Sequence, residues 1–276
     1  MIEKQTTAAQ ETPIPGKPSL SHPDPDGSGV LGKWSGLAQI FDETGSTMDE
    51  ARSLAKSGAP HMSIVVARRQ TKGRGRLART WESRDGGLYF TLVTRPLLPV
   101  SKAHLVLFTA SFALCTVLRE KFGVNASVKW PNDLLAEGKK ISGMLSELSA
   151  EGDEVSFLNI GIGVNVNNDP TAALAESTSL RLLLGREIDT MEVLKAFLDE
   201  FERGFARIED KGVMARWKAL SLTPGREVTI STTSITLTGT ALDVDEDGAL
   251  ILRLSDGSVE RVIHGDCFHR EPAHES

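Results

Sequence analysis

A basic stretch between two apolar runs is the most informative part of this chain: residues 67–81 are ARRQTKGRGRLARTW. The stretch holds six cations and no acid, although the 276-residue chain has a formal net charge of -6. Because it lies between the apolar runs Ser63–Ala67 and Leu88–Val93, the pattern predicts a strand–loop–strand unit in a folded domain. A basic loop in an acidic protein suits the binding of one small, highly charged anion, and a solvated surface loop is the alternative.

The residue types within the loop favour a phosphate site. Gly73 and Gly75 have no Cβ, so their backbone can adopt positive φ and come close to a ligand. Arg74 and Arg76 alternate with these glycines and offer forked donors to phosphate oxygens. Trp81 follows with an apolar ring that suits stacking against a flat ligand.

Composition indicates a soluble globular protein of one large or two modest domains. The acidic charge balance argues against general DNA or RNA binding. Cys115 and Cys267 lie in no metal-binding spacing and fit a reducing cytoplasm, and the histidines form no zinc pattern, so no protein ligand to a metal is expected. No signal peptide is evident, and the apolar run His104–Leu118 is too short and interrupted to span a membrane.

The fold class expected from the patterns is α+β. Prolines and scarce aliphatic residues over residues 1–30 predict a flexible tail, which we bound at residues 1–36, with order expected to begin near Trp34–Leu37. A mixed α and β pattern over residues 37–222 predicts the main domain. Residues 223–276 carry short strands separated by turn signals, which predict a small β-barrel.

The main domain is expected to contain two long amphipathic helices, Ser101–Phe122 and Asp189–Glu209. A shorter helix, Asp49–Lys56, follows Thr47 and Glu50, which have the spacing of a capping box. The strands of this domain are expected at Gln39–Phe41, Ser63–Ala67, Leu88–Arg95, Ile141–Leu148 and Val155–Val166. Those of the barrel are expected at Glu227–Ser231, Ile235–Val244, Leu250–Leu254 and Val259–Ile263.

A second polar cluster is the segment KWPND at residues 129–133. Its proline should turn the chain out of a strand and display Asn132 and Asp133. Lys140 begins the next apolar strand, in which Gly143 removes side-chain bulk and leaves room for a ligand. We therefore expect the Lys140 ammonium to hold a carboxylate against a phosphate.

Two further clusters have open interpretations. Residues 161–167 (GIGVNVN) contain an incomplete dinucleotide fingerprint that no helix follows, so the glycines more simply allow close approach of a flat ligand. Asn165 and Asn167 either face that ligand or form a turn. Ser46 and Thr47 either cap the following helix or bind a small polar head group.

Together these clusters resemble the biotin–protein ligases. The matching segments, in the family's order, are 45–47 (GST), 70–76 (QTKGRGR), Trp81, 129–133 (KWPND), 139–143 (KKISG) and 161–165 (GIGVN). The resemblance covers about residues 37–270 and implies the monofunctional type without a DNA-binding domain. It implies a catalytic domain of the class II synthetase-like type and an SH3-like C-terminal barrel. Leu77 and Ala78 depart from the family's usual Arg-Gly pair, and Met48 stands where Asn is common.

The resemblance implies ATP-dependent ligation of biotin to a lysine of a biotin carboxyl carrier domain, through biotinoyl-5′-AMP and with Mg²⁺ on the ATP phosphates. It also implies a cytoplasmic enzyme, a monomer or weak homodimer, that binds neither DNA nor membranes. A lipoate–protein ligase is the nearest alternative, and a non-enzymatic RNA-binding module is the second.

The resemblance also assigns roles to individual residues. The catalytic residues are Lys140, Arg76 and Asp133. The biotin-binding residues are Ser46, Thr47, Met48, Gln70, Gly73, Arg74, Gly75, Arg76, Lys140 and Gly143. The residues that bind ATP or the adenylate are Arg74, Arg76, Arg79, Trp81, Asn132, Lys140 and Asn165. In these roles Lys140 bridges carboxylate and phosphate, Arg76 closes over the intermediate and Asp133 orients the incoming amine.

Overall fold

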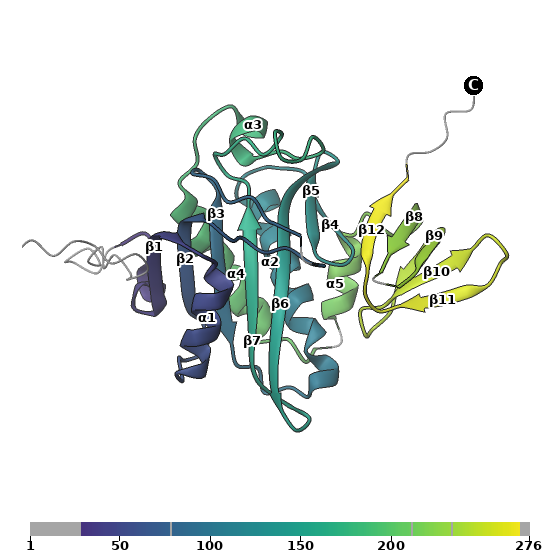
Figure 1. Ribbon diagram of the computed structural model, residues 1–276, viewed down its shortest axis with the longest axis horizontal. Helices are drawn as coiled ribbons and strands as arrows, with labels where there is room; N and C mark the ends of the chain where they lie inside the picture. The colour runs from purple at the N-terminus through teal and green to yellow at the C-terminus, as the bar shows by residue number, and fades with distance from the viewer. Residues whose placement is uncertain (1–28, 78, 211, 233, 271–276) are drawn as a thin grey trace, which may run out of the picture.

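The computed structural model describes residues 29–270 except 78, 211 and 233. Its larger sheet has seven strands in the order β1-β2-β3-β7-β6-β5-β4 (Figure 1). β1 pairs with β2 in parallel and the other neighbours pair antiparallel, so the sheet is mixed, as expected. The strands are β1 Ala38–Thr44, β2 Ser63–Gln70, β3 Leu88–Thr94, β4 Ala126–Lys129, β5 Asp133–Ala136, β6 Lys139–Glu151 and β7 Glu154–Val164.

Alternating apolar residues allow helices to cover both faces of this sheet. In β2, Ile64 and Val66 belong to the main core with α2 (His104–Glu120) and α4 (Thr190–Phe205). Val65 and Ala67 point to the opposite face, where they pack with α1 (Thr47–Lys56). The remaining helices are α3 Leu180–Leu184, α5 Val213–Ala219 and the 3-10 helices Gly32–Leu37 and Val100–Lys102.

The apolar character of α2 reflects its place in the core. Against the expectation that this run is too short, the helical segment Val100–Glu120 has the length and composition of a membrane span. In the structure α2 packs against β4, β5 and β6 of the sheet and against the helices α4 and α5, and Leu114 and Cys115 are fully buried. Burial in a protein core accounts for its composition.

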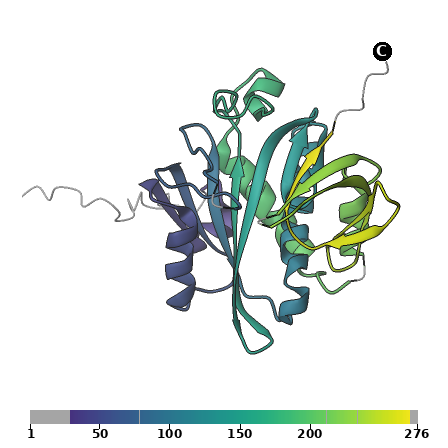
Figure 2. The same ribbon diagram turned by 45° about the vertical axis from the view of Figure 1, so that its right-hand side comes forward.

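The C-terminal sheet has five antiparallel strands in the order β11-β10-β9-β8-β12 (Figure 2). The strands are β8 Glu227–Ser231, β9 Thr236–Val244, β10 Leu250–Leu254, β11 Val259–Val262 and β12 Asp266–His269. The expected α+β fold with a small SH3-like barrel is confirmed. Trp130 links the main domain to the C-terminal sheet, because its buried Nε1 donates to the carbonyl oxygen of Gly248 at 2.9 Å.

The N-terminal boundary of the ordered chain differs from the expectation. Residues 1–28 of the expected tail lie outside the described residues. Leu31 and Trp34, which also fall in the expected tail 1–36, are buried, and Trp34 Nε1 donates to Asp199 on α4 at 2.9 Å. Order begins near Trp34, as expected, and the tail bound at residue 36 lies several residues too late because Leu31 and Trp34 are already buried.

The expected capping box at the start of α1 is also wrong. The N-cap residue is Ser46, and its side chain makes no capping hydrogen bond. Thr47 lies inside the helix and its Oγ1 donates to Gln70 instead, while Glu50 accepts a hydrogen bond from Thr44. The hydroxyls of Ser46 and Thr47 are thus not used for capping.

Candidate functional site

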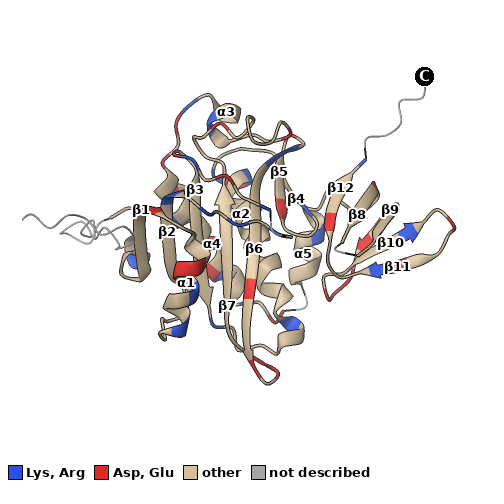
Figure 3. Ribbon diagram, in the orientation of Figure 1, with Lys and Arg blue, Asp and Glu red and all other residues tan. Residues whose placement is uncertain are grey.

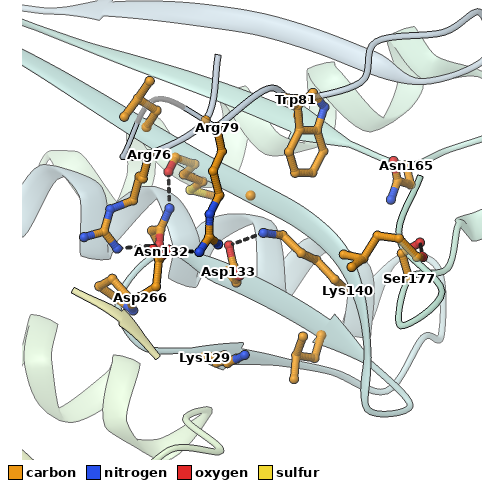
Figure 4. Close-up of a pocket in the computed structure, with 18 of the residues that line it drawn as sticks. Arg76, Arg79, Trp81, Lys129, Asn132, Asp133, Lys140, Asn165, Ser177 and Asp266 are labelled. Carbon is orange, nitrogen blue, oxygen red and sulfur yellow. Dashed lines mark hydrogen bonds and ion pairs between the residues drawn. The ribbon is translucent and has the colours of Figure 1, made fainter. Parts of the chain in front are cut away.

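A cavity of about 1090 Å³ lies between the larger sheet, the arginine loop, the segment 170–177 and strand β12 (Figure 4). It gathers segments that are far apart in the sequence. Every expected site residue except Gly73 lines it: Ser46, Thr47, Met48, Gln70, Arg74, Gly75, Arg76, Arg79, Trp81, Asn132, Asp133, Lys140, Gly143 and Asn165.

Neutral hydrogen-bonding groups form one end of the cavity. Gln70 Oε1 accepts from Thr47 N at 2.8 Å and from Thr47 Oγ1 at 3.1 Å, and its Nε2 donates to Ser83 at 2.8 Å. Behind Thr47, the buried hydroxyl of Thr91 donates to Thr47 Oγ1 at 2.8 Å. This preorganised network has the donors and acceptors needed for a small polar head group.

Glycines make the floor of the cavity flat. Gly143 on β6 and Gly163 on β7 are paired across the ladder, and the Trp81 ring lies directly on them. A Cβ added to Gly163 would lie 2.4 Å from Trp81 Cε2, and one added to Gly143 would lie 2.8 Å from Trp81 Cζ3. Next to this pair, a Cβ on Gly161 would lie 2.7 Å from Met48 Sδ. The glycines are therefore needed so that Trp81 and Met48 can approach the sheet.

Cations and carboxylates meet at the other end of the cavity. Lys140 Nζ lies 2.8 Å from Asp133 Oδ1 and 5.4 Å from the centre of the Trp81 ring. Figure 4 shows Lys140 and Asp133 pointing toward one another below Trp81. Both side chains are mostly buried, so their charges are weakly screened by solvent.

Arg76 links the arginine loop to the rest of the cavity wall. Its Nη1 donates to Asn132 Oδ1 at 3.1 Å and to the carbonyl oxygen of Gly265 at 3.2 Å. Burial lowers the pKa of the Arg76 guanidinium, and the carboxylates of Asp266 and Asp133 oppose this effect. The guanidinium keeps its charge, so the cavity presents a fixed cation in addition to Lys140.

Arg79 reaches the barrel. Its guanidinium lies 2.5 Å from Asp266 Oδ2 and 5.7 Å from the centre of the Phe268 ring. Asp266 is 12% exposed at the side chain, whereas Arg79 is 59% exposed. Asp266 of the barrel thus holds the part of the arginine loop that contains Arg79 through an ion pair.

The two glycines of the loop do not use the positive φ that their lack of a Cβ allows. Neither Gly73 nor Gly75 has positive φ; among the described residues of the loop, Leu77 has it, at 50°. A Cβ on Gly73 would lie 2.3 Å from the carbonyl oxygen of Trp81. Gly73 is therefore needed for contact between the two arms of the loop rather than for a left-handed turn, and it does not line the cavity.

The asparagines of the expected site also stabilise the backbone around it. Asn132 Nδ2 donates to the carbonyl oxygen of Met144 on the neighbouring strand. Asn165 is buried and its Oδ1 accepts from Asn168 Nδ2 at 3.0 Å, while Asn167 bonds both backbone groups of Ile188. Asn165 and Asn167 therefore form a turn network, and Asn165 also lines the cavity.

The sequence patterns missed two parts of the lining. One is the segment 170–177, and the other is a set of residues from the barrel: Arg226, Asp266, Cys267, Phe268, His269 and Arg270. Burial, together with Lys129 and Arg226, lowers the pKa of His269 to about 4. No local motif marks these residues, because their place at the cavity depends on docking of the barrel.

The described residues of the cavity lining do not provide a set of side-chain ligands that could hold a metal ion without the substrates. Among the described residues, no group of three His, Cys, Asp or Glu side chains could hold one. Of the four lining carboxylates, Asp133 is paired with Lys140, Asp266 with Arg79 and Glu82 with Arg84, and Glu176 is the fourth. This donor set fits a Mg²⁺ that is bound mainly by substrate phosphates and water, with one carboxylate such as Asp133 as a further ligand.

Comparison with protein families identifies a chain with this mixed sheet, cationic cavity and small barrel as one of the biotin and lipoate ligases. Residues 40–167 match the family model described as "Biotin/lipoate A/B protein ligase family", and residues 223–270 match "Biotin protein ligase C terminal domain".

Individual relatives narrow the class. The "Bifunctional ligase/repressor BirA" of Bacillus subtilis is 35% identical over 233 residues, covering 82% of this chain and 71% of the relative. The "Biotin--[acetyl-CoA-carboxylase] ligase" of Paracoccus denitrificans is 34% identical, covering 78% of this chain and 93% of the relative. The solved "Biotin protein ligase from Aquifex aeolicus in complex with biotin and ATP" has a TM-score of 0.71 and 29% identity, covering 85% and 99% of the two chains. The chain belongs to the biotin protein ligase family.

Proposed function

We propose that this chain joins biotin to ATP, forming biotinoyl-5′-AMP, and then transfers the biotinoyl group to a lysine of a biotin carboxyl carrier domain. The observation that carries the proposal is the layout of one cavity. It has neutral hydrogen-bonding groups at one end, a glycine floor in the middle and the cations Lys140 and Arg76 at the other. The relatives named as biotin ligases support the same reaction.

The layout suits biotin, which has a polar ureido ring, an apolar chain and a carboxylate. Ser46, Thr47 and Gln70 bind the ureido ring by exchanging the Thr47–Gln70 hydrogen bonds for bonds to the ligand. The apolar chain lies along the floor next to Met48. This orientation directs the carboxylate toward Lys140.

In the first step a biotin carboxylate oxygen attacks the α-phosphorus of ATP, the bond to the β-phosphate oxygen breaks and pyrophosphate leaves. Two anions must meet, so catalysis requires charge neutralisation. Lys140 exchanges its ion pair with Asp133 for contacts to the carboxylate and the α-phosphate. Arg76 stabilises the same phosphate, Trp81 packs near the adenine, and Mg²⁺ bound with ATP neutralises further charge.

In the second step the carrier lysine attacks the acyl carbon of the mixed anhydride, and the carbon–oxygen bond to AMP breaks. Asp133, released from Lys140, accepts a hydrogen bond from the incoming amine and orients it.

The carrier domain is that of a biotin-dependent carboxylase. A cytoplasmic location, a monomer or weak homodimer, and a lack of DNA binding remain predictions. Figure 3 shows Lys and Arg mixed with Asp and Glu on both sheets, which favours the ligase over an RNA-binding module.

The test is transfer to a carrier. The purified chain is incubated with biotin, MgATP and a carrier domain, and the carrier is analysed by intact mass. Biotinylation at one lysine is expected, and a carrier with that lysine replaced by arginine serves as the control. Transfer of lipoate but not of biotin would contradict the substrate assignment.

A further inference from the structure

A fully buried threonine lies behind the neutral end of the cavity. Thr91 is on β3, every residue of which is buried, and its side chain has no exposed surface. Phe90 and Leu92 on this strand belong to the main core, so Thr91 and Val93 point to the opposite face, where α1 packs. Valine has nearly the shape of threonine, and burying a hydroxyl is costly unless it has a partner. Packing alone therefore does not explain a hydroxyl at position 91.

The chemistry of the partners fixes the direction of the hydrogen bonds that begin at Thr91. Gln70 Oε1 accepts from Thr47 N at 2.8 Å, and a backbone N–H can only donate, so it is the amide oxygen that faces Thr47. The Thr47 hydroxyl, 3.1 Å from the same oxygen, must therefore be the donor in that bond. Its proton is then in use, so Thr91 is the donor in the 2.8 Å bond between the two threonines. The donors thus run in one direction, from Thr91 to Thr47 to Gln70.

The Thr91 hydroxyl acts on the cavity only through Thr47. Among the described residues, its side chain makes a hydrogen bond to Thr47 alone, and Thr91 does not line the cavity, whereas Thr47 does. The bond joins two regular elements, since Thr47 is the first residue of α1 and Thr91 is in the middle of β3. Its geometry therefore does not depend on the arginine loop.

Donation by Thr91 limits what Thr47 can offer to a ligand. A hydroxyl has one proton and two lone pairs. Because Thr91 occupies one lone pair of Thr47 Oγ1, one proton and one lone pair are left for Gln70 and the ligand together. Without Thr91, Thr47 would be free to turn both lone pairs toward the cavity and to act as a double acceptor. Donation by Thr91 also polarises the Thr47 hydroxyl and so strengthens the bond that this hydroxyl donates.

We propose that Thr91 is a positioning residue that sets the hydrogen-bond polarity of Thr47. It thereby favours a ring that has both donors and an acceptor, such as the ureido ring, over a ring that has donors only. This inference rests on the proposed function and deepens it, because it names a residue behind the binding surface that selects between rings of nearly the same shape.

The test is a binding titration of Thr91→Val with two ligands. One is biotin, and the other is its cyclic guanidinium analogue, in which a protonated nitrogen replaces the ureido oxygen so that the ring presents donors only. Loss of one neutral hydrogen bond should raise the dissociation constant for biotin about two- to tenfold. The analogue should lose less, because Thr47 is then free to accept from it. The ratio of its dissociation constant to that of biotin should therefore fall by at least about twofold.

Two variants of the same strand serve as controls. Thr94→Val removes an equally buried hydroxyl, which donates to the carbonyl oxygen of Leu158 at 2.7 Å and does not line the cavity, so both dissociation constants should stay at their wild-type values. Thr91→Ser keeps the hydroxyl and should bind both ligands as wild type does. Melting curves establish that each variant is folded, and Thr91→Ala, which also lacks the hydroxyl, should give the same fall in the ratio as Thr91→Val.

Steady-state kinetics separate positioning from chemistry. In Thr91→Val the KM for biotin should rise with the dissociation constant, while kcat at saturating biotin and MgATP should not change, because the hydroxyl contacts neither the ligand nor a reacting atom.

Wild-type binding of biotin by folded Thr91→Val would overturn the proposal. So would weaker binding with an unchanged ratio, because the hydroxyl would then act through packing, and so would a fall in kcat alone. An equal loss in Thr94→Val would overturn it as well, since any buried hydroxyl of the strand would then have the same effect. Failure of the proposed function gives a different result, because wild type itself would then show no binding of biotin.

Discussion

The contact between Trp81 and the glycine floor predicts the effect of one added methyl group. In Gly163→Ala the new Cβ would lie 2.4 Å from two atoms of the indole ring, whereas carbon atoms in contact are about 3.5–4.0 Å apart. The ring must therefore lift by about 1 Å into the space that the ligands need. Overpacking of this kind typically costs about 1–3 kcal/mol, which corresponds to roughly 5- to 150-fold in adenylate formation.

The assay is single-turnover ATP cleavage with saturating biotin. The control is Gly36→Ala, because Gly36 has no neighbour within 4 Å of an added Cβ and no positive φ. Trp81→Ala removes the ring, so Gly163→Ala should add little to it, and the double-mutant cycle should show coupling. A wild-type rate in Gly163→Ala, or full additivity with Trp81→Ala, would refute the placement of the ring on the glycine pair.

Three further outcomes follow from the charges and hydrogen bonds of the cavity. Lys140→Ala should slow adenylate formation by about a hundredfold or more with the fold intact, measured by single-turnover ATP cleavage, since the cation needed in the first step is lost. Arg76→Gly should still form the adenylate but release it early, seen as indiscriminate labelling of bystander lysines; tight retention of the adenylate would contradict this role. The His269 pKa is about 4 in the folded state and about 6.5 when unfolded. As the pH falls, the unfolded state takes up the His269 proton at a higher pH than the folded state does. The free energy of unfolding should therefore decrease as the pH drops from about 6.5 to about 4. Urea midpoints should show a smaller fall in His269→Asn, and an equal fall would exclude this contribution.

Elements with a sustained apolar pattern could be predicted from the sequence. The strands β2, β3, β6 and β7 and the helices α2 and α4 lie where periodicity places them, because each buries a continuous face. The four-residue strands β5 and β12 were not predicted, and β4 was expected only as a strand of unstated length before Pro131. β12 (DCFH) is only four residues long and begins and ends with the polar residues Asp266 and His269. It therefore carries no apolar pattern that predicts a strand, and its strand conformation depends on pairing with β8.

The site residues that come from the main domain could also be predicted, because they lie in short motifs rich in glycine, lysine and arginine. The contribution of the barrel could not. Arg76 and Gly265 are 189 residues apart in the sequence, and nothing local to Asp266 indicates that it meets Arg79. Gly73 shows a second limit: a glycine in the sequence allows positive φ or close approach, and only the structure shows that the close contact is with the backbone of Trp81.

The central claim is that this cavity activates the carboxylate of biotin with ATP. The most direct measurement is exchange of labelled pyrophosphate into ATP by the purified chain, as a function of biotin concentration and with Lys140→Ala alongside. Exchange should require biotin, saturate with it and fall about a hundredfold in Lys140→Ala. Exchange that proceeds without biotin, responds to lipoate alone or is unchanged in Lys140→Ala would contradict the account.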